Sequence, residues 1–275
     1  MYRLLFLLCA SFISAQTYRF VYEYKMKPDA GKKDSVVTDY MNLDTDGKKS
    51  YFYNAVKYER DSAYLTDKSY SALLKGKRYD RNLNYTIEKD YAKKTISFYD
   101  RFKNASLVIK DNSTPNWIIE NEFKKINNMN CQKAIADYKG RKWEAWFSKD
   151  FPVNDGPYKF SGLPGLVVMI KDSENDHTFD LIQIKKINAL ANFVPKNNKL
   201  ITNEAYRKLL KGYTFSSGED IAGMSIDSKA GKMEMQLKDG YITQFDYNEL
   251  KKSGANMDAV IANKLRLSNN PIEKE

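Results

Sequence analysis

The chain has 275 residues, of which 42% are hydrophobic and 13% aromatic, and its formal net charge at pH 7 is +10. This length suffices for one large domain or two small ones with a sizeable core. The basic residues are scattered among Asp and Glu and do not gather on one element, which argues against a nucleic-acid-binding protein and indicates a solvated surface.

The chain begins like a secretory leader. Arg3 supplies a positive start, residues 4–13 are largely apolar, and the small residue Ala15 stands before the expected cut. The apolar run is too short for a transmembrane helix, which needs about 20 residues. We therefore expect a signal peptide over 1–15 and a mature protein over 16–275 in the periplasm or outside the cell, with no membrane span after cleavage.

Residues 17–26 alternate strictly between apolar and polar positions, which predicts a half-buried strand. The apolar face consists of Tyr18, Phe20, Tyr22, Tyr24 and Met26. Residues 35–43 and 50–53 have the pattern of two further strands, and the short turns between them predict an antiparallel meander. Residues 55–75 are ambiguous, with one or two helical turns and then an exposed excursion.

The rest of the chain is dominated by short strand patterns. They cover residues 85–87, 95–99, 106–109, 117–123, 131–138, 142–147, 166–170, 177–187, 232–237 and 241–243. Thr202 is a good N-cap for a helix that ends at Gly212, and residues 257–265 suggest a last short helix.

These elements predict a mainly β protein with a single curved, largely antiparallel sheet, half-barrel-like or sandwich, and a few short helices. The helical segments 55–75 and 202–212 are expected to plug its concave side. No stretch rich in Gly, Ser or Pro marks a boundary, so we expect a single domain over 16–275.

Residues 137–170 hold two of the three tryptophans and three of the seven prolines. Pro164 fixes its own φ and favours an extended Leu163. The order Pro164-Gly165 predicts a type II turn with a positive φ at Gly165. We expect this turn to lead into a buried strand that begins at Leu166, although the glycines could instead let a ligand or partner approach the backbone closely.

Several motifs follow one another in this region. They consist of Cys131, Arg141, Trp143, Trp146, Gly156, Pro157, Tyr158, Gly162, Leu163, Pro164, Gly165 and Leu166, with a looser echo at Asn270, Pro271, Ile272 and Glu273. This arrangement resembles the GLPGLI family, also called Porph_ging, of secreted proteins from Gram-negative bacteria. Val167 and Phe151 stand where Ile is usual in the family. The resemblance implies an exported protein without a known activity.

Few residues are suited to catalysis or metal binding. One His, His177, and one mature Cys, Cys131, cannot form the usual zinc site, and no Ser lies in a G-x-S-x-G motif. We expect a buried, inert Cys131 thiol; the alternative is a reactive thiol with His177 as its base. We therefore predict no catalytic, cofactor or metal residues.

Two classes of function stay open. The preferred one is a non-enzymatic binding or accessory protein for an envelope or outer-membrane protein or an amphipathic ligand. Arg141, Trp143, Trp146 and Tyr158 are of the types that anchor interfaces, although the tryptophans could equally be core. The alternative is a carboxylate-based hydrolase of the cell envelope. Converging, partly buried carboxylates would favour the enzyme, and an apolar groove would favour the binder.

Overall fold

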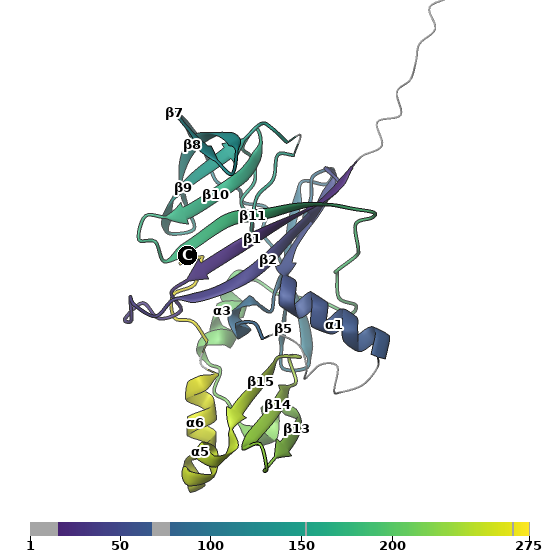
Figure 1. Cartoon of the computed structure of the whole chain (residues 1–275), viewed down its shortest axis with the longest axis vertical. Helices are drawn as coiled ribbons and strands as arrows, with labels where there is room; N and C mark the ends of the chain where they lie inside the picture. The colour runs from purple at the N-terminus through teal and green to yellow at the C-terminus, as the bar shows by residue number, and fades with distance from the viewer. Residues whose placement is uncertain (1–15, 68–77, 152, 266, 275) are drawn as a thin grey trace, which may run out of the picture.

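Figure 1 shows the computed structural model of this chain, which describes residues 16–67, 78–151, 153–265 and 267–274. The expected signal peptide at 1–15 and part of the ambiguous segment, 68–75, lie outside the described residues. Within the described ranges, no helix combines the length and the apolar character that a membrane crossing requires.

Twelve strands form one open sheet in the order β12-β6-β5-β4-β3-β2-β1-β11-β10-β9-β8-β7. Their bounds are β1 (Thr17–Met26), β2 (Val37–Thr45), β3 (Lys49–Asn54), β4 (Thr86–Asp90), β5 (Thr95–Phe102), β6 (Ala105–Lys110), β7 (Ile118–Ile126), β8 (Met129–Tyr138), β9 (Arg141–Ser148), β10 (Leu166–Asp172), β11 (His177–Ile187) and β12 (Lys199–Leu200). Among these neighbours only β12 and β6 pair in parallel. The predicted mainly β, largely antiparallel fold is confirmed.

The sheet is built from two meanders that meet at its centre. Strands β1 to β6 follow one another in sequence order, and so do β7 to β11. The two meanders join where β1 pairs with β11, from Thr17 opposite Ile187 to Met26 opposite His177. The segment that resembles the family therefore forms most of the second meander, beside β1.

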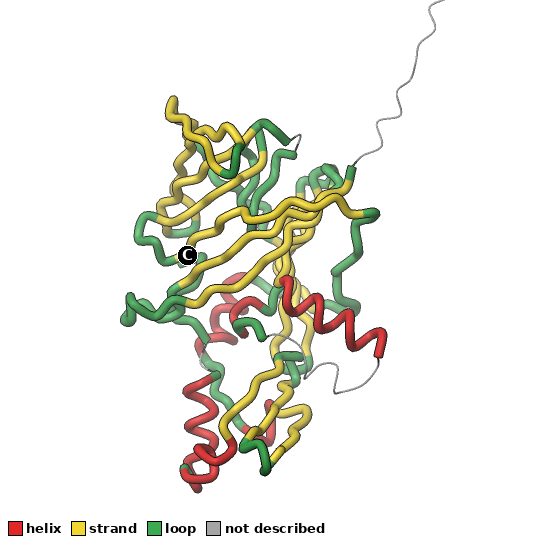
Figure 2. The backbone as a smooth tube through the Cα atoms, viewed as in Figure 1, coloured by secondary structure: helices red, strands yellow, loops and turns green. Residues whose placement is uncertain are grey.

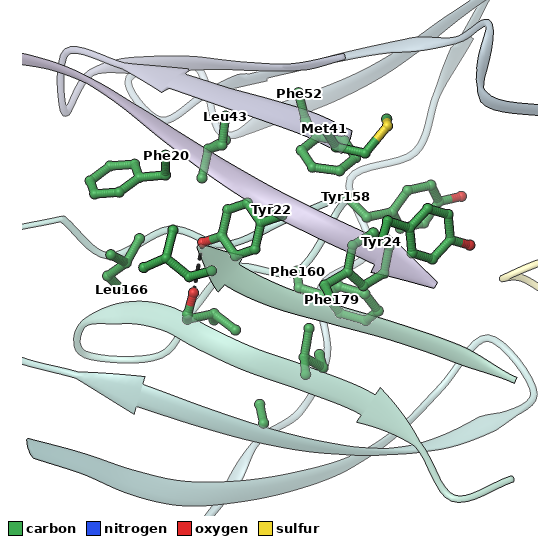
Figure 3. Close-up of a cluster of buried hydrophobic side chains, with 14 of the residues drawn as sticks. Phe20, Tyr22, Tyr24, Met41, Leu43, Phe52, Tyr158, Phe160, Leu166 and Phe179 are labelled. Carbon is green, nitrogen blue, oxygen red and sulfur yellow. Dashed lines mark hydrogen bonds between the residues drawn. The ribbon is translucent and has the colours of Figure 1, made fainter. Parts of the chain in front are cut away.

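The core lies on the sheet face that carries Phe20, Tyr22 and Tyr24 (Figure 3). The alternation of β1 places these side chains on one face, where all three are buried. The segment 153–165 crosses this face, and its Phe160 packs against Trp143 with ring centroids 4.5 Å apart. Tyr22 satisfies its buried hydroxyl by donating to the carbonyl of Val167 at 2.6 Å.

The two longest helices pack on opposite faces of the sheet. Helix α1 (Ala55–Asp67) has 13 residues, more than the expected one or two turns, and its Tyr58 contacts Tyr53. Helix α3 (Asn203–Lys211) has the predicted caps, and its Tyr206 packs against Phe98. Strand pairing through β3, β4 and β5 places Phe98 on the same face of the sheet as Phe52. Tyr53 follows Phe52 in β3 and therefore points to the other face, so α1 and α3 cover different faces. The expectation that both segments plug one side is wrong.

A small second sheet and three short helices form the C-terminal part, in the lower half of Figure 1. Its elements are α4 (Ser217–Asp220), β13 (Ile221–Asp227), β14 (Lys232–Leu237), β15 (Ile242–Asp246), α5 (Tyr247–Lys252) and α6 (Met257–Lys264), with a 3-10 turn at Gly254–Asn256 between α5 and α6. Another 3-10 turn, Arg81–Leu83, precedes β4. The predicted β14–β15 hairpin is present, whereas α4, β13 and α5 were not predicted. Their side chains pack in a hydrophobic cluster separate from the main one. Figure 2 shows the strands of this part beside the helices at the bottom of the view. The single-domain expectation stays a prediction.

Candidate functional site

Arg141 begins β9 and is almost completely buried, with a side-chain exposure of 1%. Its guanidinium donates to Asp172 Oδ2 at 2.7 Å and to Asn270 Oδ1 at 2.6 Å. It also donates to the carbonyls of Pro271 at 2.8 Å and Ile272 at 3.1 Å. The Arg141 side chain therefore joins the motif segment at β9 to residues 270–272, which carry the looser echo of the family pattern near the C-terminus.

Two further contacts hold the C-terminal residues next to those that Arg141 binds. Tyr158 donates to Glu273 Oε1 at 2.9 Å, and Lys159 forms an ion pair with that oxygen at 2.6 Å. Burial raises the pKa of the Tyr158 hydroxyl, which therefore keeps its proton and remains a donor. We call residues 268–274 the C-terminal strap. The polar motif residues bind this strap of their own chain.

The two tryptophans of the motif face opposite sides of β9. Trp143 packs on Phe160 and donates to the carbonyl of Tyr138 at 3.1 Å. On the other side, Trp146 lies under Lys124, whose Nζ is 3.8 Å from the ring centroid. Both tryptophans are buried. In this structure both contribute to packing, and neither is a free aromatic anchor on the surface.

The positive φ expected at Gly165 is wrong. Gly162 has φ +94°, whereas Gly165 has an ordinary φ and donates to the carbonyl of Leu163 at 2.9 Å. A Cβ built on Gly165 would lie 2.3 Å from the carbonyl oxygen of Ser148 in β9. Gly165 is therefore required by a close approach of two backbones, and not by its own conformation. The next residue, Leu166, starts the buried strand β10 as predicted.

Gly156 and Pro157 lie in the loop that leads to Tyr158. The carbonyl of Gly156 accepts a hydrogen bond from Lys89 Nζ at 2.6 Å, and Lys89 also forms a buried ion pair with Asp155. Burial lowers the pKa of Lys89, because an ammonium group loses its hydration there. These contacts fix the motif loop to β4 on the core face.

Cys131 is buried, as expected, and burial raises the pKa of its thiol. Its strand neighbour is Ser148, which pairs with Leu166 at the start of β10. His177 follows the opposite end of β10, roughly 20 Å away at the rise of a β-strand. The alternative of a Cys131 nucleophile with His177 as its base is therefore wrong.

A cavity of about 670 Å³ lies between the core face of the first meander, α3 and the C-terminal strap. Its aromatic lining consists of Tyr24, Tyr85, Phe98, Tyr158, Tyr206, Tyr213 and Phe215. Its ionisable lining groups besides tyrosine include Arg81, Asp100, Lys159, His177, Arg207, Lys211, Glu273 and Lys274. A site of this size with an apolar wall and a few polar groups is typical of a small-ligand site.

Two fully buried polar side-chain atoms in the cavity wall have no hydrogen-bond partner among the described residues. They are the hydroxyl of Tyr85 and Nε2 of His177. Tyr85 is only 6% exposed, and burial raises its pKa, so its hydroxyl is a protonated donor. His177 accepts or donates at Nδ1 with Tyr24 at 2.6 Å, and burial lowers its pKa to about 4. Because the Asn270 main chain lies close to this ring, Tyr85 is the clearer indication of a missing partner.

Asp100 is a carboxylate of this cavity with a raised pKa. Burial raises its pKa to about 6, and Asp239 adds to the effect. The hydrogen bonds from the Tyr206 hydroxyl and the Arg101 amide, with the charge of Arg81, act in the opposite direction. The negative charge of Asp100 therefore lowers the stability of the folded state near pH 7.

We expect Asp100→Asn to raise the free energy of unfolding by about 1–3 kcal/mol at pH 8 and to change it little at pH 4. The folded pKa of Asp100 exceeds the usual 3.8. Between these two pKa values the native state binds more protons than the unfolded state does. The free energy of unfolding therefore falls as the pH rises from about 4 to about 6. Urea denaturation at both pH values measures the difference. The exposed Asp137→Asn is the control, and an equal effect of Asp100→Asn at both pH values would contradict the assignment.

The sequence did not indicate this cavity. Its walls come largely from the 3-10 turn Arg81–Leu83, β5, α3 and the strap, segments that no local pattern connects. One part could have been found: Asn203, Tyr206, Arg207, Leu210 and Lys211 share one face at helical spacing. The predicted binding region, residues 141–160, contributes only Tyr158 and Lys159 to the lining.

Known proteins resemble this chain in part. Residues 90–169 match the family model Porph_ging, described as a protein of unknown function. Two solved structures, of PNGF-II in the C2 and P21 space groups, are similar with a TM-score of 0.51 each, at 16% and 15% identity. The similarity covers 81% of this chain and 40% of each PNGF-II chain, and at this identity it shows a shared fold alone.

No curated protein matches the sequence. The family match runs from the end of β4 into β10 and includes most of the motif residues that carry the resemblance. The resemblance to the GLPGLI family is therefore confirmed by the match of residues 90–169 to the Porph_ging model, which describes a protein of unknown function.

Proposed function

We propose that this protein is a non-enzymatic envelope binding protein that takes a small amphipathic ligand into the cavity beside the C-terminal strap. The leader-like first 15 residues support export to the periplasm or the exterior. The cavity has the volume of a small-ligand site and a wall rich in aromatic rings. Tyr85 and Phe98 stack at 5.0 Å and offer a broad apolar surface.

The observation that carries this proposal is the unpaired hydroxyl of Tyr85. A buried hydroxyl without a partner costs roughly 1–3 kcal/mol relative to one that is hydrogen-bonded. A phenylalanine in its place would avoid that cost. A bound molecule with an apolar body and a polar atom opposite Tyr85 would satisfy the hydroxyl and cover the rings around it.

The motif residues have a supporting part in this proposal. Arg141, Tyr158 and Lys159 hold the strap, and residues 268–274 form one wall of the cavity. On this account the motif acts through the strap and does not itself contact an external partner. A partner protein in the envelope that exchanges the ligand remains part of the proposal.

We expect Tyr85→Phe to weaken binding of decanol, an uncharged amphiphile, by about 2–10-fold, the contribution of one hydrogen bond. Calorimetric titration of the purified protein below the aqueous solubility limit of decanol measures it. The stability of the ligand-free variant should stay equal or rise, because an unsatisfied group has been removed.

Tyr91→Phe is the matched control for this titration. Its hydroxyl is also buried, but the residue does not line the cavity, so decanol affinity should not change. Absence of saturable binding of decanol and of its acidic analogues, or equal affinity in the Tyr85→Phe variant, would overturn the proposal.

The alternative of a carboxylate-based hydrolase has one observation in its favour. Asp100, with its raised pKa, and Glu273 line the same cavity, and paired carboxyl groups in different environments are typical of acid–base catalysis. However, Oε1 of Glu273 already binds both Tyr158 and Lys159. We therefore favour binding over hydrolysis.

A further inference from the structure

We propose that the ligand of this cavity carries an acidic headgroup, a carboxylate or a phosphate, that binds to Arg207 and Lys211 of α3. This inference rests on the proposed function, whose ligand class it makes more specific. It concerns the end of the cavity that α3 forms.

The geometry of α3 brings the two cations to the cavity. Arg207 and Lys211 are four positions apart in the sequence, so they lie one turn apart on the same face of the helix. Both line the cavity, together with Tyr206 and Leu210 of the same face. Arg207 is half-buried and Lys211 is exposed, which places one charge inside the site and the other at its edge.

The other cations of the cavity have their charge balanced. Arg81 pairs with Asp239 at 2.7 Å, Lys159 with Glu273 at 2.6 Å, and Lys274 with Glu174 at 3.3 Å. Within the described part of the chain, Arg207 and Lys211 form no ion pair or side-chain hydrogen bond. The cavity therefore offers two positive groups that no carboxylate of the described chain neutralises.

The outer face of the same helix is arranged differently. Glu204 and Lys208 form an ion pair at 2.9 Å across one helical turn, in the order that favours a helix. On the inner face, two like charges at that spacing repel each other. An anion between them would remove the repulsion, and the planar guanidinium of Arg207 suits a carboxylate or phosphate, which it can bind through two hydrogen bonds.

The rest of the cavity suits the body of such a molecule. From α3 the wall continues over Tyr206, Phe98 and Tyr85, whose neighbouring rings are 5.7 and 5.0 Å apart. An aliphatic or aromatic body can cover these rings while its headgroup stays at Arg207. The unpaired hydroxyl of Tyr85 then lies along the body of the ligand, where one further polar atom would pair with it.

The test compares three probes of equal chain length: decanoate, decyl phosphate and decanol. We expect wild-type protein to bind the better of the two acids about tenfold more tightly than decanol, since two solvent-accessible charges contribute about 2–5-fold each. The double variant Arg207→Gln/Lys211→Gln should lose this preference and bind decanol unchanged. The two acidic probes distinguish a carboxylate ligand from a phosphate ligand.

Lys208→Gln is the matched control, because it removes one positive charge from the outer face of the same helix. It should leave the preference for the acid in place. Added salt should weaken binding of the acids and not that of decanol, a measurement that needs no variant.

The outcomes separate the two proposals. Equal affinities for acids and decanol, or an acid preference that survives in the double variant, would overturn the acidic headgroup and leave the binding function standing. If none of the three probes binds saturably, the proposed function itself fails.

Discussion

Replacing Arg141 by methionine should lower the free energy of unfolding by about 3–5 kcal/mol, the loss typical of a broken buried ion pair. The methionine fills much of the volume, but Asp172 then keeps a buried charge without its partner at 2.7 Å. Asn270 and the carbonyls of the strap lose their donors as well. Urea denaturation measures the loss, and hydrogen exchange of residues 268–274 should show that the strap opens more often.

Two further variants test the reason for this loss. Arg101→Met removes an arginine from an exposed position and should change stability by no more than about 0.5 kcal/mol. Adding Asp172→Asn to Arg141→Met should recover part of the loss, because the uncompensated charge disappears. If Arg141→Met were as stable as wild type, the contacts of Arg141 between β9 and the strap would not be stabilising.

Gly165→Ala should destabilise the protein by about 3 kcal/mol, the upper part of the range for overpacking. The new Cβ would meet the Ser148 carbonyl oxygen at 2.3 Å and its carbon at 2.8 Å. These atoms belong to the backbone of β9, which cannot move aside as the end of a side chain can. Strands β9 and β10 must therefore separate locally, and thermal and urea unfolding should both report the loss.

Two other glycines separate steric contact from backbone conformation. The new Cβ of Gly162→Ala meets only Trp117 Cδ1, at an ordinary contact distance of 3.8 Å, but the residue holds φ +94°, so the change should cost about 1 kcal/mol. Gly218→Ala meets no atom within 4 Å and has no positive φ, so it should be close to neutral. A larger loss at Gly162 than at Gly165 would contradict the close-approach explanation and restore a conformational one.

Local patterns predicted most of the strands because their cause is local. Alternation along residues 17–26 predicts one buried face, and β1 has that face in the structure. The caps at Thr202 and Gly212 predict the ends of α3 for the same reason, since both satisfy backbone groups of their own helix. Strand β13 was missed because its residues are mostly exposed and Gly223 interrupts the pattern.

Helix α5 shows a signal that was available but not used. Asp246 caps its first turn by accepting from the amide of Glu249, the spacing of a capping motif. The helix has only six residues, too short for a hydrophobic period to be recognised. Its stability comes from Leu250, which joins the second hydrophobic cluster.

The motif is a mixed case. Its composition predicted that Leu166 opens a buried strand, which the structure confirms. The role of Gly165 was misjudged, because the atom that excludes a side chain belongs to Ser148, 17 positions earlier and on the neighbouring strand. A turn rule considers only the four residues of the turn and contains no information about that neighbour.

By itself, the sequence determined the class of fold, the positions of most strands and the family resemblance, since each depends on residues close together in the chain. Only the tertiary structure decided that β1 pairs with β11, that Arg141 binds Asn270, and that Tyr85 and Arg207 line one cavity. These contacts join segments more than 100 residues apart. Their energy depends on burial and on the relative placement of whole strands, which no local periodicity specifies.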